Sequence, residues 1–186
     1  KLKELPNTRA LVFQLFQDFG FTDFNAIFEL LSAQSGKQVV SKTHRLLKDR
    51  ETLILTEVPK AENPSPKISI PKGTSQITEP VAITFQNAAG RTLTNAHTFF
   101  VDGDLLDFPL TLRKWSEGDW FQPFGMKGKK KLSKFLKDEK LSLAAKENIW
   151  LLCSGPTVVW VVGQRGDERF KVMPNTKNIL KLTFSP

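Results

Sequence analysis

The sequence contains little cysteine and histidine, and this scarcity excludes several kinds of site. Cys153 is the only cysteine in 186 residues, so the chain can form neither an internal disulfide nor a cluster of zinc thiolates. It lies in the apolar run 149–153, which predicts a small buried side chain rather than a reactive thiol. His44 and His97 each lack a histidine or cysteine neighbour at metal-ligand spacing. We therefore expect neither a metal site nor a nucleophilic catalyst.

Long apolar segments are also absent. No stretch approaches the roughly 18 to 20 apolar residues that span a bilayer, and residues 1–5 do not lead into the hydrophobic region of a signal peptide. The sequence therefore predicts no membrane partner and a cytoplasmic location. Because it starts at Lys1 without an initiator methionine, we expect a fragment of a longer polypeptide.

The apolar content is sufficient for folded domains. Hydrophobic residues make up 40% of the chain, with 15 phenylalanines and four tryptophans that can fill a core. Three prolines mark residues 59–67 as the best candidate for a linker, because proline does not continue a β-ladder and favours an extended connector. We place a boundary near residue 62 and predict two domains, 1–61 and 62–186.

The first domain is expected to contain two helices and then a β-hairpin. The spacing of apolar residues predicts one helix that starts at Asn7 or Thr8 and ends at Gly20. A second helix is expected to start at Thr22. A polar turn before the β-branched segment 52–58 indicates the hairpin. The apolar residues of both helices are predicted to be core: Val12, Phe13, Phe16, Phe19, Phe24, Ile27, Phe28 and Leu31.

The second domain is expected to be rich in strands. Apolar and β-branched runs between turn residues predict strands at 68–70, 77–85, 92–101, 110–112, 158–162 and 179–183. Only residues 129–137 give a convincing helical pattern in this half. The predicted fold class is therefore α+β: an N-terminal helical piece with a β-hairpin, then a β-rich C-terminal domain with one short basic helix.

Positive charge is concentrated in residues 113–140. The net charge of the chain is +8, and this stretch carries nine basic residues against four acidic ones, which supplies +5 of the total. On the predicted helix, Lys130, Lys134 and Lys137 are spaced i, i+4 and i+7 and line one face. Aligned like charges repel one another, so a bound polyanion would stabilise the row. A solvated surface that binds nothing is the alternative.

Aromatic and acidic residues accompany these cations in the sequence. Trp115 and Trp120 suit either stacking on bases or packing in the core, and we favour core packing. The four carboxylates of the stretch have no histidine beside them, so we assign them structural roles rather than acid–base or metal chemistry. Residues 125–131 do not fit the GxxxxGK[ST] spacing of a phosphate-binding loop, and no nucleotide site is predicted.

Spaced glycines, aromatics and basic residues recur between residues 113 and 138 and again at 160–165. The pattern reads R-x-x-x-x-G-D-x-F-x-P-x-G-x-x-G, then a K-K-L helix start, a later aspartate, and W-V-x-G-x-R. Fourteen positions carry it: Arg113, Gly118, Asp119, Phe121, Pro123, Gly125, Gly128, Lys131, Leu132, Asp138, Trp160, Val161, Gly163 and Arg165. This pattern resembles the C-terminal domain of bacterial tRNA(Ile)-lysidine synthetase. Residues 1–61 resemble, more loosely, the end of that family's middle, substrate-binding domain.

The resemblance implies a ligase that acts on tRNA. The intact enzyme would use ATP and Mg²⁺ to join L-lysine to the wobble cytidine of an isoleucine tRNA with a CAU anticodon, which changes decoding from AUG to AUA. In this family an N-terminal domain with an SGGxDS loop binds ATP, and no such string occurs in this chain. L-Lysine and ATP are therefore expected to bind through that missing domain. We expect this chain to hold no cofactor and to be inactive alone.

The role that the resemblance implies for this chain is to hold the tRNA body, for which phosphate contacts suffice. The residues expected to contact the RNA backbone are Arg113, Lys127, Lys129, Lys130, Lys134, Lys137 and Arg165. Gly125 and Gly128 are expected to form tight turns beside the RNA. Gly118 and Asp119 are expected to form a structural turn, in which Asp119 pairs with Arg113 or caps the loop.

One alternative from a different functional class remains open. The β-rich half would then be a non-catalytic assembly module that docks on the catalytic domain or on a second subunit, as in a homodimer, with its lysines merely solvated. A generic RNA-binding β domain is a further reading of the same charge pattern.

Overall fold

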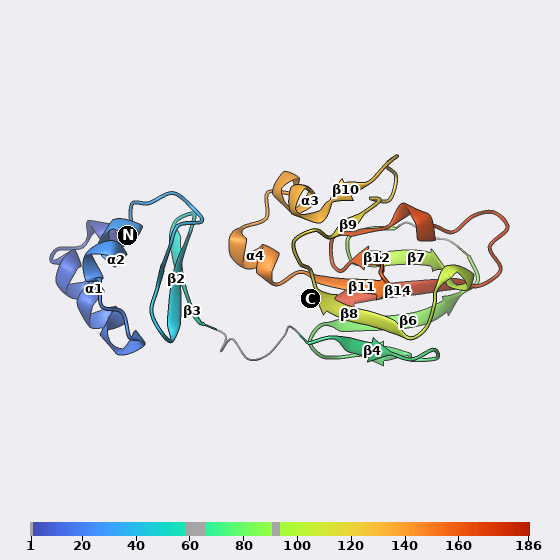
Figure 1. The fold of residues 1–186 in the computed structure, drawn as a ribbon, viewed down its shortest axis with the longest axis horizontal. Helices are drawn as coiled ribbons and strands as arrows, with labels where there is room; N and C mark the ends of the chain where they lie inside the picture. The colour runs from blue at the N-terminus through green and yellow to red at the C-terminus, as the bar shows by residue number, and fades with distance from the viewer. Residues whose placement is uncertain (1, 59–65, 91–93) are drawn as a thin grey trace. The chain divides into compact units, whose positions relative to one another are not determined.

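The computed structural model describes residues 2–58, 66–90 and 94–186, and the chain divides into two compact units (Figure 1). One unit is Lys1–Pro64 with the short segment Ser142–Ala145, and the other is Ser65–Leu141 with Lys146–Pro186. The predicted boundary near residue 62, and most of the predicted linker 59–67, lie outside the described residues. Within the described ranges, no helix is long and apolar enough to cross a membrane.

The first unit packs two short helices on a three-stranded antiparallel sheet of order β1-β2-β3. Its helical elements are η1 (Leu2–Glu4), α1 (Thr8–Phe16), η2 (Gln17–Phe19) and α2 (Phe24–Leu30). Its strands are β1 (Gln38–Val40), β2 (His44–Asp49) and β3 (Thr52–Glu57). The predicted hairpin is confirmed as β2 and β3, with β1 as an additional strand. Gly20 ends the first helical stretch in a left-handed conformation (φ 72°), as expected.

Two predictions for these helices are wrong in detail. Helix α2 is capped by Asp23 rather than by Thr22, because the Asp23 carboxylate accepts a hydrogen bond from the backbone N–H of Ala26 at 2.9 Å. Phe13, expected in the core, is 49% exposed, whereas Val12 is 1% exposed. Adjacent residues of a helix point about 100° apart, so only one of this pair can face the sheet.

The second unit is a sandwich of two antiparallel sheets. The five-stranded sheet has the order β13-β12-β11-β8-β4, and the four-stranded sheet has the order β5-β6-β14-β7. Their strands are β4 (Ile68–Ile70), β5 (Gln76–Ile77), β6 (Ala82–Ala88), β7 (Thr98–Asp102), β8 (Leu110–Lys114), β11 (Trp150–Ser154), β12 (Thr157–Val161), β13 (Arg165–Gly166) and β14 (Ile179–Ser185). Two 3-10 turns, η3 (Gly103–Leu105) and η4 (Glu168–Phe170), lie in the connections. The predicted α+β class with a β-rich C-terminal domain is confirmed.

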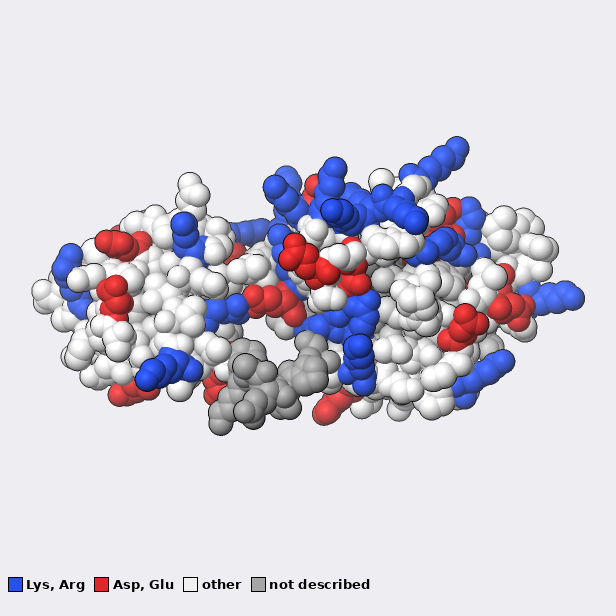
Figure 2. Space-filling view, in the orientation of Figure 1, with Lys and Arg blue, Asp and Glu red and all other residues white. Residues whose placement is uncertain are grey.

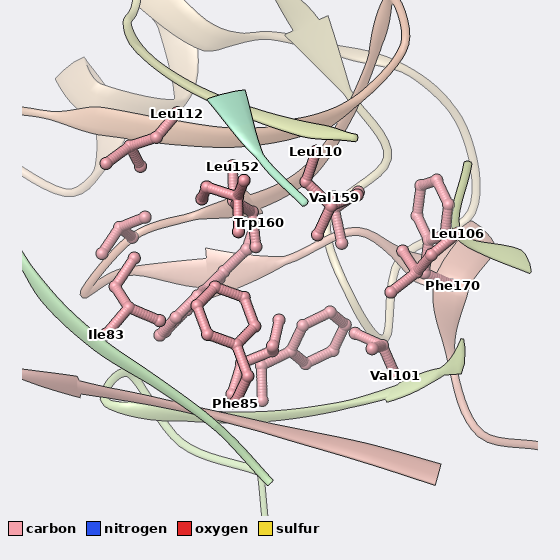
Figure 3. Close-up of a cluster of buried hydrophobic side chains, with 14 of the residues drawn as sticks. Ile83, Phe85, Val101, Leu106, Leu110, Leu112, Leu152, Val159, Trp160 and Phe170 are labelled. Carbon is pink, nitrogen blue, oxygen red and sulfur yellow. The ribbon is translucent and has the colours of Figure 1, made fainter. Parts of the chain in front are cut away.

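The main core lies between these two sheets. Figure 3 shows Ile83 and Phe85 of one sheet together with Leu110 and Val159 of the other. The predicted strand 77–85 is divided into β5 and β6, because Pro80 cannot continue a β-ladder. Residues 92 and 93 of the predicted strand 92–101 lie outside the described residues. Residues 94–97 are not strand, so the prediction is wrong there, and β7 begins at Thr98.

Strand β11 runs through the centre of the unit and is buried on both faces. Trp150 and Leu152 belong to the core between the sheets, whereas Leu151 and Cys153 face a second apolar cluster on the outer side. The expectation of a buried thiol is confirmed, since Cys153 is 1% exposed. The strand itself was not predicted, because a continuous apolar run lacks the alternation that distinguishes a half-buried strand.

A layer of short elements covers the outer face of the five-stranded sheet. It consists of β9 (Trp120–Phe121), β10 (Lys130–Lys131) and α3 (Leu132–Asp138). The short helix α4 (Leu143–Glu147) follows along the chain; it was not predicted, and its residues up to Ala145 are grouped with the first unit. The predicted helix 129–137 is wrong at its start, because Lys130 and Lys131 pair with β9 as an antiparallel strand and α3 begins at Leu132. The apolar face of α3 completes the second cluster with Phe135 and Leu136.

Candidate nucleic-acid interface

A bidentate ion pair closes the turn that leads into β9. Arg113, on β8, donates from both terminal nitrogens to the two carboxylate oxygens of Asp119, each at 2.8 Å. Asp119 also accepts from the backbone N–H of Ser116 at 2.8 Å, across a turn in which Gly118 has a φ of 96°. Burial would raise the pKa of Asp119, but the hydrogen bonds from Arg113 and Ser116 outweigh it and lower the pKa. The carboxylate therefore acts as an ionised scaffold group.

A second arginine–aspartate pair anchors the other end of β9. The Asp167 side chain is fully buried and accepts from Arg169 Nε at 2.8 Å and from a terminal nitrogen at 2.7 Å. It also accepts from the backbone N–H of Gln122 at 2.9 Å. A buried carboxylate is stable only with such partners. This pair was not predicted, although the sequence carries a D-x-R pattern one residue after the W-V-x-G-x-R motif.

The first half of the loop between β9 and β10 is hydrogen-bonded to the segment that contains Gly166 and Glu168. Phe124 N–H donates to the Gly166 carbonyl and Gly125 N–H donates to the Glu168 carboxylate, both at 2.8 Å. Gly125 and Gly128 have φ values of 81° and 99°, and an added Cβ at either would meet nothing within 4 Å. Glycine is needed there for backbone conformation rather than for space, because other residues rarely adopt positive φ. Both glycines thus form tight, solvent-facing turns.

Helix α3 is fixed to the ribbon of β9 and β10 by three contacts. The backbone N–H of Leu132 donates to the Asp119 carbonyl at 2.8 Å. The rings of Phe121 and Phe135 meet edge to face, with centroids 5.0 Å apart. Lys130 Nζ lies 2.9 Å from the Asp138 carboxylate. The loop, the two-stranded ribbon and the helix therefore form one supported platform.

Lysines occupy the solvent side of this platform. Figure 2 shows Lys and Arg side chains gathered over the part of the second unit that contains α3, β9 and β10. We define the basic surface by its exposed lysines: Lys127, Lys129, Lys131, Lys134, Lys137 and Lys140. Four of the seven predicted contact residues belong to it: Lys127, Lys129, Lys134 and Lys137. Lys131 and Lys140 were not selected from the sequence, although they lie in the same charged stretch.

The other three predicted contact residues are not part of this set of exposed lysines. Lys130 is not on the helix, so the predicted i, i+4, i+7 row is wrong, and its ammonium is paired with Asp138. Arg113 is engaged by Asp119. Arg165 is exposed on β13, and its guanidinium carbon lies 6.0 Å from the ring centre of Phe135.

Arg165 also borders a pocket beside α3. The pocket has a volume of about 460 Å³, and Phe124, Phe135 and Glu139 contribute to its lining. Arg165 is thus brought close to the platform, although it comes from the second motif of the sequence.

The two tryptophans of the charged stretch differ in environment. Trp115 packs partly buried against the outer apolar cluster and donates from Nε1 to the Lys146 carbonyl at 2.6 Å, as core packing predicts. Trp120 is 38% exposed, so core packing is wrong for it. Successive residues of a strand point to opposite faces, and Phe121, at 0% exposure, takes the inward position of β9.

The described residues offer no metal centre. Nowhere in the described ranges do three or more His, Cys, Asp or Glu side chains gather closely enough to hold a metal ion. What the platform does present is a set of exposed lysine ammonium groups on a hydrogen-bonded base, and such a set is suited to an anionic partner.

Known proteins match this chain along almost its whole length. Residues 1–58 match a family model described as the TilS substrate binding domain, and residues 110–182 match one described as the TilS substrate C-terminal domain. The chain is 43% identical over 98% of its length to a tRNA(Ile)-lysidine synthase of Parabacteroides distasonis. It is 34% identical over 96% of its length to one of Bacteroides thetaiotaomicron. It spans only 43% and 40% of these two relatives.

A solved structure shares the fold. A crystal structure of a TilS C-terminal domain aligns with 63% of this chain and 89% of its own, with a TM-score of 0.50 and 20% sequence identity. At 20% identity this match supports a shared fold and nothing further.

Proposed function

Because this chain belongs to the tRNA(Ile)-lysidine synthase family, we propose that it is the tRNA-binding C-terminal region of such an enzyme. The whole enzyme joins L-lysine to the wobble cytidine of an isoleucine tRNA with a CAU anticodon and consumes ATP, so that the codon AUA is read instead of AUG. The part played by this chain is to hold the tRNA body while another region modifies the base. Since tRNA is a cytoplasmic substrate, we propose the same location for the enzyme.

The basic surface is the observation that supports this proposal. Its lysines are exposed on a platform that two arginine–aspartate pairs fasten to the sandwich. Lysine ammonium groups bind phosphates without regard to base sequence, which suits a positioning role. Because the platform is already ordered, binding loses little backbone freedom.

Within this proposal the cations have two different roles. Lys127, Lys129, Lys134 and Lys137 contact phosphates, with Lys131 and Lys140 as further members of the same surface and Arg165 beside it. Arg113 and Lys130 act as positioning residues, because each is already paired with a carboxylate of the platform. A paired cation gains less from a phosphate, since it must first lose its partner.

We assign ATP, Mg²⁺ and L-lysine to a catalytic region outside this chain. The sequence contains no SGGxDS loop, and the described residues present no cluster of ligands for a divalent cation.

A salt titration of tRNA binding tests the proposed function. With three or four phosphates neutralised, the logarithm of the affinity should fall against the logarithm of the salt concentration with a slope of roughly −2 to −4. The double variant Lys134→Glu with Lys137→Glu should bind more weakly and show a shallower slope. Lys177→Glu makes the same type of charge change at an exposed position outside the basic surface and should stay close to the unmodified chain.

Two results would contradict the proposal. The first is no measurable tRNA binding at low salt. The second is a double variant that keeps its tRNA affinity but loses association with a catalytic region or with a second copy, measured by sedimentation. The second result would support the assembly module instead.

A further inference from the structure

Trp120 places an exposed aromatic ring inside the basic surface. Lys129 Nζ lies 4.1 Å from the centre of this ring, and the guanidinium carbon of Arg169 lies 4.7 Å from it. Directly opposite on the ribbon, Trp120 pairs with Lys131. An indole surrounded by cations is suited to an anionic ligand that also has a flat apolar face, and a nucleotide has both.

The two cations at the ring differ in how firmly they are held. Arg169 is locked by two hydrogen bonds to the fully buried Asp167 side chain. Lys129 is exposed, follows the turn at Gly128, and makes no ion pair with the described residues. A ligand can therefore displace the Lys129 ammonium from the indole and leave Arg169 in place.

We propose that Trp120 is a stacking site for one unpaired base of the bound RNA, with Lys129 moving from the indole to the adjoining phosphate. Base stacking on an aromatic ring is stronger than the cation–π contact of an exposed lysine, so this exchange is favourable. The ligand is an unpaired nucleotide, because the faces of bases within a duplex are covered by their neighbours. Stacking tolerates any base, so the site selects single-stranded character rather than sequence.

This inference rests on the proposed RNA-binding function and extends it to one side chain. Affinity measurements of the 186-residue chain, at fixed salt, with a blunt RNA duplex and with the same duplex carrying a short single-stranded extension provide the test. Trp120→Ala should lose roughly 5- to 100-fold in affinity for the extended RNA and much less for the blunt one. Trp120→Phe keeps a ring and should lose less. Thermal melting of both variants verifies that they are folded.

Two further measurements report on the exchange itself. The unmodified chain should show fluorescence quenching on binding the extended RNA, and Trp120→Phe should lack that part of the signal. Lys129→Gln should keep the quenching but reduce the magnitude of the salt slope by about one, because one phosphate contact is lost.

The outcomes separate this inference from the proposed function. If the chain binds neither RNA at low salt, the proposed function itself fails. If it binds both, and Trp120→Ala weakens them equally or not at all, the stacking site is overturned while the phosphate-binding surface stands. Equal weakening would show that Trp120 only supports the loop.

Discussion

Phe121 and Phe135 meet edge to face, with ring centroids 5.0 Å apart and an interplanar angle of 81°. One ring comes from the strand that precedes the loop and the other from the helix that follows it, so this contact holds both ends of the platform together. Both side chains are almost fully buried, at 0% and 2% exposure. The stability of the basic surface is thus coupled to this aromatic pair, which belongs to the outer apolar cluster.

Removal of one ring should therefore destabilise the second unit strongly. Phe121→Ala leaves a cavity under the platform, and such truncations lower the free energy of unfolding by about 3–5 kcal/mol. Urea denaturation measures the loss. Leu105→Ala removes a side chain that is 49% exposed in the same unit and should change stability by no more than about 0.5 kcal/mol. Similar losses in the two variants would contradict the coupling.

The Arg113–Asp119 pair predicts how stability depends on pH. The pKa of Asp119 is lowered from its ordinary value of 3.8 in the folded chain, so its contribution is fully present above pH 3.8 and is lost as the pH falls through the folded pKa. Asp119→Asn should be less stable at neutral pH and should lose less stability on acidification. Thermal melting between neutral and acidic pH measures the difference from the unmodified chain.

A matched control exists beside this pair. Glu117→Gln makes the same change in charge at an exposed position of the same turn and should follow the unmodified chain at every pH. If Asp119→Asn and Glu117→Gln give parallel curves, the ion pair does not contribute to the acid response.

Cys153 should be unreactive in the folded chain. Burial raises the pKa of the thiol and outweighs the opposing effect of Arg113, so little thiolate is present at neutral pH, and the side chain is 1% exposed. A colorimetric disulfide reagent should label it only after denaturant is added. Rapid labelling of one thiol per chain in native buffer would show that β11 opens readily.

Gly166 should tolerate no side chain. A Cβ at this position would lie 2.3 Å from the ring of Phe99, which is fully buried in the sandwich core. Gly166→Ala should therefore lower the free energy of unfolding by about 1–3 kcal/mol, as overpacking does. Gly90→Ala, where a Cβ meets nothing within 4 Å, is the matched control and should be nearly neutral. Adding Phe99→Leu to the first variant should recover part of the loss by making room.

Much of the strand content could be predicted from local pattern, but the platform could not. Strands such as β8 and β14 combine apolar residues with flanking turn residues, which is a local signal. Strands β9 and β10 have two residues each and exist because they pair with one another, and that pairing also moves the start of α3 to Leu132. The helical spacing of residues 129–137 does not reveal that Lys130 and Lys131 have a strand partner, and this partner overrides their helical preference.

Only part of the candidate site was predicted, because some of its contacts are also tertiary. Clustering of lysines is visible in sequence, and four predicted lysines, Lys127, Lys129, Lys134 and Lys137, lie on the basic surface. The contacts of Trp120 with Arg169, and of Asp167 with Gln122, join segments that are far apart along the chain. Charge pattern alone also could not tell an exposed lysine from one paired within the platform, such as Lys130.

The loop between β9 and β10 has two halves that differ in how strongly the structure constrains them. Its first half is hydrogen-bonded to the segment that contains Gly166 and Glu168, whereas its tip at Gly128 has open space around it. Mutations at the tip and on the solvent side of α3 can therefore alter the charge presented to a partner without altering the fold. Mutations at the arginine–aspartate pairs alter both together. The charge that this surface presents can thus be changed by substitutions at the lysines, while the hydrogen-bonded base beneath them keeps its structure.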